Sequence, residues 1–422
     1  MTNTLVDTYL SIRRQTLRLV EGLSAEDLVL QSMPDASPAK WHLAHTTWFF
    51  EAFFLQKKCK HYTPFNPQFQ VLFNSYYNTV GEQHPRPQRG MLARPSLDEV
   101  LAYRHHVDKH MVSLLTECEE ISCSAVTVGL HHEMQHQELL LTDLLHLFSL
   151  NPLKPPVMAG DTTLLDTPVS NDCQPYFKVY SESLTTIGCN GPQKDTRKRS
   201  SVPFSYDCER PAHSVFMPAF RMSNRLVTNR EWLAFMDDGG YKQSLLWLSD
   251  GWLCKERNNW CAPLYWIQCK QGWQEFGLDG LQPVNLSSPV CHVSYYEADA
   301  YARWAGKRLP YEYELEKIAL QRPIEGQFLE QLQWRPQPAE STEGMHQIYG
   351  DVWEWTQSAY SAYPGFIPER GALGEYNGKF MANQFVLKGG SCVTPKALVR
   401  ASYRNFFHPQ QRWQFSGLRL AE

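Results

Sequence analysis

Apolar residues recur at helical spacing through the first 150 residues of the chain. They return every three to four positions, which is the pattern of an amphipathic helix with one buried face. Four helices of these lengths predict an antiparallel bundle. The apolar stripes cover residues 6–20, 41–53, 96–115 and 126–150.

Two of these predicted helices begin at residues that commonly start helices. Ser37 followed by Pro38 matches an N-cap with proline at the first helical position. Ser96 and Glu99 have the spacing of a capping box. Between the two helices lies a long segment, residues 62–95, rich in proline, glycine and aromatic residues. Loops of this length in a compact domain are usually functional or disordered, and the varied composition favours a functional loop.

The pattern changes beyond residue 175 to short alternating segments, glycine and tryptophan clusters, and long loops. A helix is predicted over residues 294–304 and a second one after Tyr311. This sequence pattern is typical of a loop-rich α+β domain. Short strands are expected near residues 185–188, 213–217 and 384–388.

We therefore predict a multidomain chain with an α part and an α+β part. Residues 1–150 form the four-helix bundle, and residues 176–422 form the α+β domain. Residues 151–175 contain five prolines, at positions 152, 155, 156, 168 and 175, and are predicted to be a linker.

Composition narrows the class of protein. The 422 residues carry 40 Lys and Arg against 44 Asp and Glu, so the net charge of −4 argues against a protein that coats DNA or RNA. No run reaches the ~20 apolar residues of a membrane span, and the N-terminus has no signal-peptide pattern. The 11 cysteines form no CxxC pair. We expect free thiols in a cytoplasmic protein without nucleic-acid or membrane partners.

The strongest chemical motif is His132-Glu133-Met134-Gln135-His136. Residues four apart lie on one face of a helix, so the two imidazoles can hold one metal ion. The same spacing occurs in zinc peptidases, where the glutamate is the general base. The longer form of that motif needs glycine and histidine where Leu139 and Thr142 stand. The peptidase therefore stays a remote alternative.

A third metal ligand is predicted on the second helix. His45 falls in line with the apolar residues of that helix, and His42 is its rival, about 60° away around the helix. A lone histidine on an apolar face is more often a core residue, but here it shares a bundle with the 132/136 pair. Three imidazoles without a carboxylate or thiolate leave coordination positions open. Such a site suits zinc with water, or ferrous iron that binds O2 and substrates.

Two further clusters are candidates for chemistry. Tyr76 and Tyr77 lie in the long loop, followed by Arg86 and Arg89. A phenol near a metal can donate a proton, and arginines can hold carboxylates bidentately, although a solvated loop explains the spacing equally well.

Near the C-terminus, Asn405 precedes Phe406 and Phe407. Aromatic faces beside an amide could receive a quaternary ammonium group, whereas core packing is the alternative. Cys392, in a Gly-Gly-Ser-Cys turn, has no histidine paired with it by motif, and we assign it a structural role.

Residues 1–150 resemble a DinB-type four-helix metal-binding domain, and residues after about 175 resemble the formylglycine-generating-enzyme (sulfatase-modifying-factor) domain, a C-type-lectin-like fold. In this order the two domains resemble the EgtB-type sulfoxide synthases of ergothioneine biosynthesis. The motifs that carry the resemblance of the second domain are residues 226–232 (LVTNREW), 292–295 (HVSY), 307–310 (KRLP), 350–355 (GDVWEW) and 389–391 (GGS).

The resemblance implies a non-haem iron enzyme with Fe(2+) held by His45, His132 and His136. It implies a reaction that joins the sulfur of a cysteine-type thiol to C2 of the imidazole of hercynine, with O2 as oxidant and a sulfoxide as product. Gln135 matches the position that hydrogen-bonds the hercynine imidazole. Positions around its betaine end are matched by Asn405, Phe406 and Phe407.

The resemblance also implies roles in the long loop. Tyr76 and Tyr77 match the branch with catalytic tyrosines there, and Arg86 and Arg89 are expected to hold the carboxylate of the thiol. The thiol is free cysteine or γ-glutamylcysteine. Two alternatives remain besides the peptidase: a selenoneine synthase that takes a selenosugar, and a non-catalytic module whose lectin-like domain binds a glycan or protein.

Overall fold

The computed structural model describes residues 4–117, 123–158, 175–191, 204–339 and 343–422. It divides into two compact units. The helical unit comprises Met1–Pro152 together with Glu369–Tyr376, and the sheet unit comprises Leu153–Pro368 and Asn377–Glu422. A short segment from late in the chain thus belongs with the N-terminal helices, which the sequence prediction did not include.

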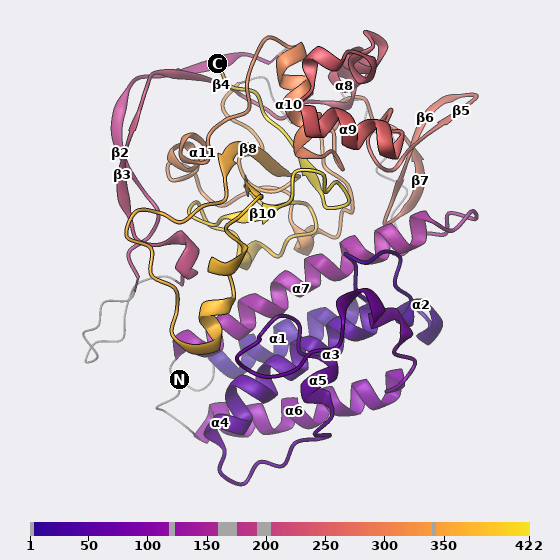
Figure 1. Ribbon diagram of the computed structural model, residues 1–422, viewed down its shortest axis with the longest axis vertical. Coiled ribbons are helices and arrows are strands. Elements are labelled where there is room, and N and C mark those ends of the chain that lie inside the picture. The colour runs from indigo at the N-terminus through magenta and orange to yellow at the C-terminus, as the bar shows by residue number, and fades with distance from the viewer. Residues whose placement is uncertain (1–3, 118–122, 159–174, 192–203, 340–342) are drawn as a thin grey trace. The chain divides into compact units, whose positions relative to one another are not determined.

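The helical unit is built on four long helices, which run side by side in Figure 1. The second of them, α3, packs against both α6 and α7, and α1 packs against the same two. This arrangement agrees with the predicted four-helix bundle. The long helices are α1 (Thr4–Arg18), α3 (Ala39–Phe50), α6 (Leu97–Glu117) and α7 (Cys123–Ser149). The shorter elements are α2 (Ala25–Val29), the π-helix η1 (Glu51–Leu55), α4 (Gln56–Lys58), α5 (Phe69–Leu72), and the 3-10 helices η2 (Arg86–Met91) and η8 (Gly371–Glu375).

Helix α3 is the centre of this unit, because every one of its residues is buried. A helix covered on all sides can pack side chains in every direction. Its predicted start was wrong by one residue: Pro38 occupies the N-cap position and no side chain caps the helix. The Ser37 amide instead donates to Asp143 Oδ2 at 2.8 Å. The Ser96–Glu99 capping box before α6 is confirmed by its two reciprocal hydrogen bonds.

The sheet unit is organised around a four-stranded sheet in the order β10-β9-β8-β11. Strand β9 pairs antiparallel with β8 and β10, and β11 pairs parallel with β8. The strands are β8 (Trp353–Ala359), β9 (Phe385–Lys388), β10 (Asn405–Phe407) and β11 (Ser416–Gly417).

Three smaller sheets are found among the described residues of this unit: β1 pairs with β4, β2 with β3, and β5-β6-β7 form an antiparallel meander. Their bounds are β1 (Phe177–Tyr180), β2 (Ser183–Ile187), β3 (His213–Met217), β4 (Phe220–Ser223), β5 (Trp266–Cys269), β6 (Gly272–Gly277) and β7 (Gly280–Pro283).

Two helices of the sheet unit, α10 and α11, begin where the sequence predicts, whereas α8 and α9 were not predicted. Ser294 and Glu297 form the capping box of α10, and α11 follows Tyr311 directly. The helices are α8 (Asn229–Asp237), α9 (Ser249–Asn258), α10 (Tyr295–Trp304) and α11 (Glu312–Ala319). The 3-10 helices are η4 (Asp207–Glu209), η5 (Gly240–Lys242), η6 (Ser244–Leu246), η7 (Leu329–Gln331), η9 (Gly378–Phe380) and η10 (Lys396–Leu398).

A buried ion pair lies inside the sheet unit, where Arg419 Nε donates to Glu354 Oε2 at 2.9 Å. Cys392, predicted to be structural, is fully buried, and its amide donates to the Asp351 carbonyl at 3.0 Å. Most of the predicted linker lies outside the described residues. Among the residues that the structure describes, none of the helices combines the length and apolarity of a membrane span.

Candidate metal centre

Three histidines converge inside the helical unit. His132 and His136 are one turn apart on α7, and His45 faces them from α3, so one ligand nitrogen from each lies within 4.8 Å of the others. Their side chains are 0%, 2% and 9% exposed for His45, His132 and His136. The structure therefore brings together the three residues predicted as metal ligands.

The spacing of the nitrogens fits one shared ion. His45 Nε2 and His132 Nε2 are 3.2 Å apart. Two nitrogens about 2.1 Å from one ion, at octahedral or tetrahedral angles, lie about 3.0–3.4 Å apart. The Nδ1 atom of His45 is occupied, since it contacts the Phe73 carbonyl at 2.6 Å. A hydrogen on that Nδ1 leaves the Nε2 lone pair for a metal.

The three imidazoles are held in the neutral form that metal binding needs. Burial, reinforced by the neighbouring imidazoles, keeps the pKa of His45 and His136 well below the usual value. Burial also lowers the pKa of His132 to about 3, against the opposing effect of the Glu133 charge. No proton therefore has to leave these rings at neutral pH before a cation binds.

His42, the rival ligand, lies outside the triad. Its Nδ1 atom is 2.8 Å from Nδ1 of His136, and its Nε2 atom is 3.0 Å from Asp143 Oδ2. Both ring nitrogens are therefore engaged away from the common point. Because His42 precedes His45 by nearly one turn of α3, it meets α7 at a different level and contacts the back of a triad residue.

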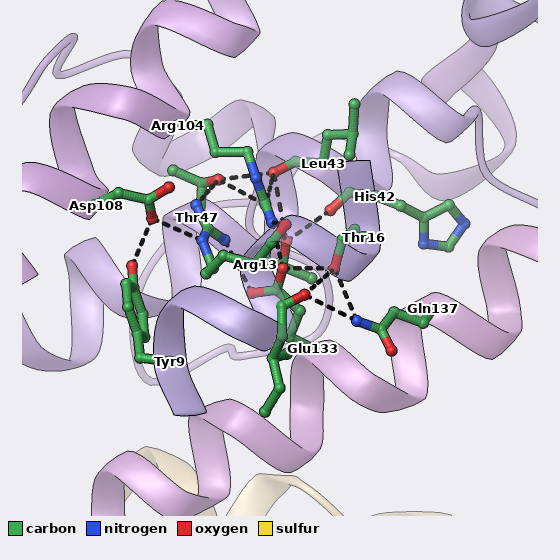
Figure 2. Close-up of polar contacts among 12 residues, drawn as sticks. Tyr9, Arg13, Thr16, His42, Leu43, Thr47, Arg104, Asp108, Glu133 and Gln137 are labelled. Carbon is green, nitrogen blue, oxygen red and sulfur yellow. Dashed lines mark hydrogen bonds and ion pairs between the residues drawn. The ribbon is translucent and has the colours of Figure 1, made fainter. Parts of the chain in front are cut away.

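Glu133 takes part in an ion-pair network on another face of α7 (Figure 2). Its carboxylate accepts hydrogen bonds from Arg13 at 2.9 Å, from Thr16 at 2.7 Å, and from Arg104. Burial alone would raise the pKa of Glu133, but Arg104 and Arg13 lower it to about 2. A fully buried carboxylate with these partners has no capacity left for a general base. The histidine–glutamate spacing of a zinc peptidase is thus present without its base.

The aromatic rings around His45 form a continuous stack. Trp41 lies parallel to the imidazole at 4.5 Å between ring centroids, and Trp48 stacks on it at 5.5 Å. The guanidinium of Arg89 lies 3.5 Å from the Trp41 ring centroid. These contacts fix the orientation of the ring and exclude water around it.

Arg89 is buried and lies in η2, whereas Arg86 is exposed. Arg89 donates to the hydroxyls of Ser37 at 2.9 Å and Ser75 at 3.2 Å, and its Nε atom has no partner among the described residues. Burial, with the nearby charge of Arg86, lowers its pKa to about 9. It still carries a positive charge at neutral pH. Arg86 donates to the Asp35 carbonyl.

Tyr76 and Tyr77 stack on each other at 4.6 Å. The ring of Tyr77 is fully buried and lies 5.8 Å from Trp48 and 5.2 Å from Phe53. Burial raises the pKa of Tyr76 to about 12. The pair therefore packs beside the aromatic residues of α3 and η1, next to residues that contact the triad.

Tyr376, which was not predicted from the sequence, lies beside the triad. Its ring is 5.8 Å from that of His132, and its hydroxyl donates to the side-chain oxygen of Gln135. The preceding residue, Glu375, accepts hydrogen bonds from the amides of Asn78 at 3.1 Å and Thr79 at 3.0 Å. These contacts join the segment Glu369–Tyr376 to the helical unit. No motif in the sequence marks Tyr376.

The residues predicted near the betaine end of hercynine lie in β10, in the sheet unit. All three are partly buried. Asn405 accepts a hydrogen bond from the amide of Phe406, whose ring stacks on Tyr360 at 4.1 Å. Phe406 also stacks on Phe380 at 5.9 Å, so its described ring contacts are packing contacts, and the binding role of these residues stays a prediction.

Comparisons with known proteins support the domain order. The family described as the sulfatase-modifying factor enzyme 1-like domain matches residues 186–341 and 330–422, and the DinB superfamily matches residues 9–140. The predicted fold class, a helical DinB-like bundle followed by a formylglycine-generating-enzyme-like domain, is confirmed.

Hercynine oxygenases are among the relatives that match this chain. The hercynine oxygenase of Mycobacterium tuberculosis is 33% identical over 97% of this chain and 96% of its own length. The hercynine oxygenase of Mycolicibacterium smegmatis is 33% identical over 99% of this chain and 98% of its own length. Ergothioneine biosynthesis protein 1 of Schizosaccharomyces pombe is 26% identical over 56% of this chain and 30% of its own length.

Proposed function

The chain belongs to the hercynine oxygenase family, and on that premise we propose that it is a sulfoxide synthase that joins the sulfur of a cysteine-type thiol to C2 of hercynine, using Fe(2+) and O2. It is an enzyme of the oxygenase class. The observation that carries the proposal is the triad of His45, His132 and His136, whose ligand nitrogens lie within 4.8 Å of one another.

The donor set supports an iron site of open coordination. Among the described residues the group contains three imidazoles and no thiolate or carboxylate. Structural zinc sites fill all four positions with protein ligands, whereas this group leaves positions for substrates. When bound, ferrous iron would supply the activation of O2 and would favour the thiolate form of the thiol substrate.

The chain's own residues orient hercynine. We assign the amide nitrogen of Gln135 to the hercynine imidazole, while its oxygen accepts the hydrogen bond of Tyr376. Gln135 lies between the two α7 ligands in sequence, so a ring bound to it would be close to the triad. Through the family resemblance, we assign the trimethylammonium and carboxylate end of hercynine to Asn405, Phe406 and Phe407, since aromatic faces attract quaternary ammonium groups.

A tyrosine hydroxyl provides a proton for the reduction of O2. Tyr376 is the stronger candidate, because its ring lies against a triad histidine and its hydroxyl against Gln135. A proton donor has to be within hydrogen-bond reach of the reacting group. The pair Tyr76 and Tyr77 remains the alternative. Tyr77 lies against Trp48, which in turn stacks on the triad residue His45.

Arg89 is assigned to the carboxylate of the thiol. It is a buried cation whose acceptors among the described residues are neutral hydroxyls, so an anionic substrate group would complete its ion pair. Arg86 is exposed and would contribute at longer range. The thiol is therefore one that carries a carboxylate, which both cysteine and γ-glutamylcysteine do.

Anaerobic reconstitution tests the proposal. The full chain is loaded with Fe(2+) and given hercynine with cysteine, γ-glutamylcysteine or a selenosugar, and O2 is then admitted. Mass analysis should show a sulfoxide adduct with one of the thiols. His45→Ala should lose product formation, whereas exposed His105→Ala on α6 should keep it. Formation of the selenium adduct alone would favour a selenoneine synthase, and no adduct with any donor would overturn the proposal.

The two remaining alternatives predict different results. A zinc peptidase would act without O2, and the engagement of Glu133 by Arg13 and Arg104 speaks against it. A non-catalytic binding module would keep its function after the triad is changed, so loss of all product formation in His45→Ala excludes it.

A further inference from the structure

A hydrogen-bonded chain of three side chains runs behind one residue of the triad. His136 Nδ1 lies 2.8 Å from His42 Nδ1, and His42 Nε2 lies 3.0 Å from Asp143 Oδ2. The same carboxylate oxygen accepts the Ser37 amide at 2.8 Å. All three residues are buried, at 9%, 3% and 7% exposure for His136, His42 and Asp143.

Helix geometry explains why these residues meet. His136 and Asp143 are seven positions apart on α7, which is close to two full turns, so they share a face. His42 lies on α3, opposite the gap between them. The Ser37 amide at the start of α3 fixes the far end of the chain. The arrangement therefore ties α3 to the ligand-bearing face of α7.

The direction of the hydrogen bonds follows from the chemistry of the groups. A carboxylate only accepts, so His42 Nε2 carries a hydrogen that it donates to Asp143. His42 Nδ1 is then the acceptor in its neutral ring, and His136 Nδ1 donates to it. This leaves the lone pair of His136 on Nε2, the ring nitrogen that His42 does not contact. The chain thus selects the tautomer of His136 that can bind a metal.

We propose that Asp143, acting through His42, is a positioning residue that sets the ring orientation and donor strength of His136 toward the metal. This inference rests on the proposed function, because it needs the triad to bind an ion. The three ligands are supported differently: His45 contacts a backbone carbonyl, and His132 Nδ1 has no hydrogen-bond partner among the described residues. Among the described contacts of the three ligands, only the hydrogen bonds of His136 lead, through His42, to a carboxylate.

A carboxylate at this position has an effect that a neutral group does not have. It stabilises partial positive charge on His42 and so strengthens the hydrogen bond that His136 donates. Electron density on His136 Nε2 rises as a result, which makes it a better ligand. Removal of such supporting groups typically weakens metal binding by about 10–100-fold.

Binding of Co(2+) to the full-length apo-protein tests the inference without any turnover. The dissociation constant is measured by competition with a chelator, and the visible spectrum of the bound ion is recorded. Asp143→Asn should bind Co(2+) about 10–100-fold more weakly, with a changed visible spectrum. Asp108→Asn is the matched control, since the described polar contacts of the Asp108 carboxylate are with Arg13 and Tyr9 and not with the triad. It should bind as the wild type does.

The outcomes separate this inference from the proposed function. Failure of the wild-type protein to bind Co(2+) would overturn the metal site itself. Binding by Asp143→Asn with the wild-type constant and spectrum would overturn the positioning role, as would an equal loss in Asp143→Asn and Asp108→Asn. If Asp143→Asn fails to fold, His42→Gln serves instead, because it breaks the same chain at its middle and should weaken binding at least as much.

Discussion

The ring of Tyr376 lies 5.8 Å from that of His132, although the two residues come from distant parts of the chain. Tyr376→Phe removes the hydroxyl and keeps the ring. Because positioned proton donors typically contribute about 10²–10⁴-fold to a rate, product formation should fall by at least about 100-fold. Product formation is followed under saturating hercynine and thiol.

Tyr77→Phe is the control for that change. Its ring is buried among Trp48 and Phe53, so loss of its hydroxyl should change the rate by less than about 10-fold. A larger loss in Tyr77→Phe or Tyr76→Phe than in Tyr376→Phe would move the proton donor to the pair that the sequence predicts.

Glu133→Gln should destabilise the fold. It leaves Arg13 and Arg104 buried without their carboxylate, and breaking a buried ion pair costs about 3–5 kcal/mol. The free energy of unfolding is measured by urea denaturation. Glu117→Gln, at the exposed end of α6, should change it by less than about 0.5 kcal/mol. A Glu133→Gln protein of wild-type stability would restore this carboxylate as a candidate catalytic base.

The metal triad was predictable from sequence because its spacing is a property of the helix. His132 and His136 are one turn apart, and His45 follows the apolar stripe of α3. What the sequence left open was the choice between His45 and His42, since both lie on neighbouring faces of α3. Packing against α7 makes that choice: one histidine enters the triad and the other supports His136.

Two features escaped prediction for different reasons. The position of Tyr376 depends on Glu375 binding the amides of residues 78 and 79, a contact between distant segments that no local pattern encodes. The start of α3 was displaced because the Ser37 amide is held by Asp143, on another helix. By contrast, α10 begins where predicted, because its capping box lies within four residues.

Arg89→Lys should raise KM for cysteine with a smaller effect on kcat. Lysine cannot reproduce a bidentate contact or the stack on Trp41, and loss of a charge-assisted hydrogen bond of about 1.5–3 kcal/mol corresponds to about 10–100-fold in KM. Steady-state kinetics with cysteine and with cysteamine, which lacks the carboxylate, measure the effect.

The cysteamine arm shows whether the carboxylate is the group that Arg89 holds. The substitution should penalise cysteine and leave cysteamine nearly unaffected, and exposed Arg86→Lys should change both by less than about 3-fold. Equal penalties for the two thiols would mean that Arg89 supports the fold around Trp41 and does not bind the substrate.

Asp351→Asn should stabilise the protein increasingly as the pH rises. Burial raises the pKa of Asp351 to about 7 from an ordinary value near 3.8, although the Gln337 amide and Arg419 oppose the shift. The folded state therefore holds its proton more tightly than the unfolded state. The wild type loses stability between about pH 4 and pH 7 as the unfolded chain ionises, by up to about 4 kcal/mol.

Asparagine has no such titration and keeps the hydrogen bond that Oδ1 accepts from Gln337 at 2.8 Å. It also tolerates the left-handed backbone at this position, where φ is 60°. Urea denaturation of both proteins at pH 4 and pH 8 measures the difference. The gain from Asp351→Asn should be small at pH 4 and largest at pH 8, and a gain of the same size at both values would contradict the assignment.

The assignment of Glu369–Tyr376 to the helical unit has a consequence for dissecting or recombining this enzyme. A fragment cut after Pro152 retains all three histidines and loses the tyrosine beside them. A chimera that swaps the C-terminal half would exchange that tyrosine together with the lectin-like scaffold. A fragment or chimera of the helical unit therefore needs a matching segment 369–376 for a tyrosine to lie beside the three histidines.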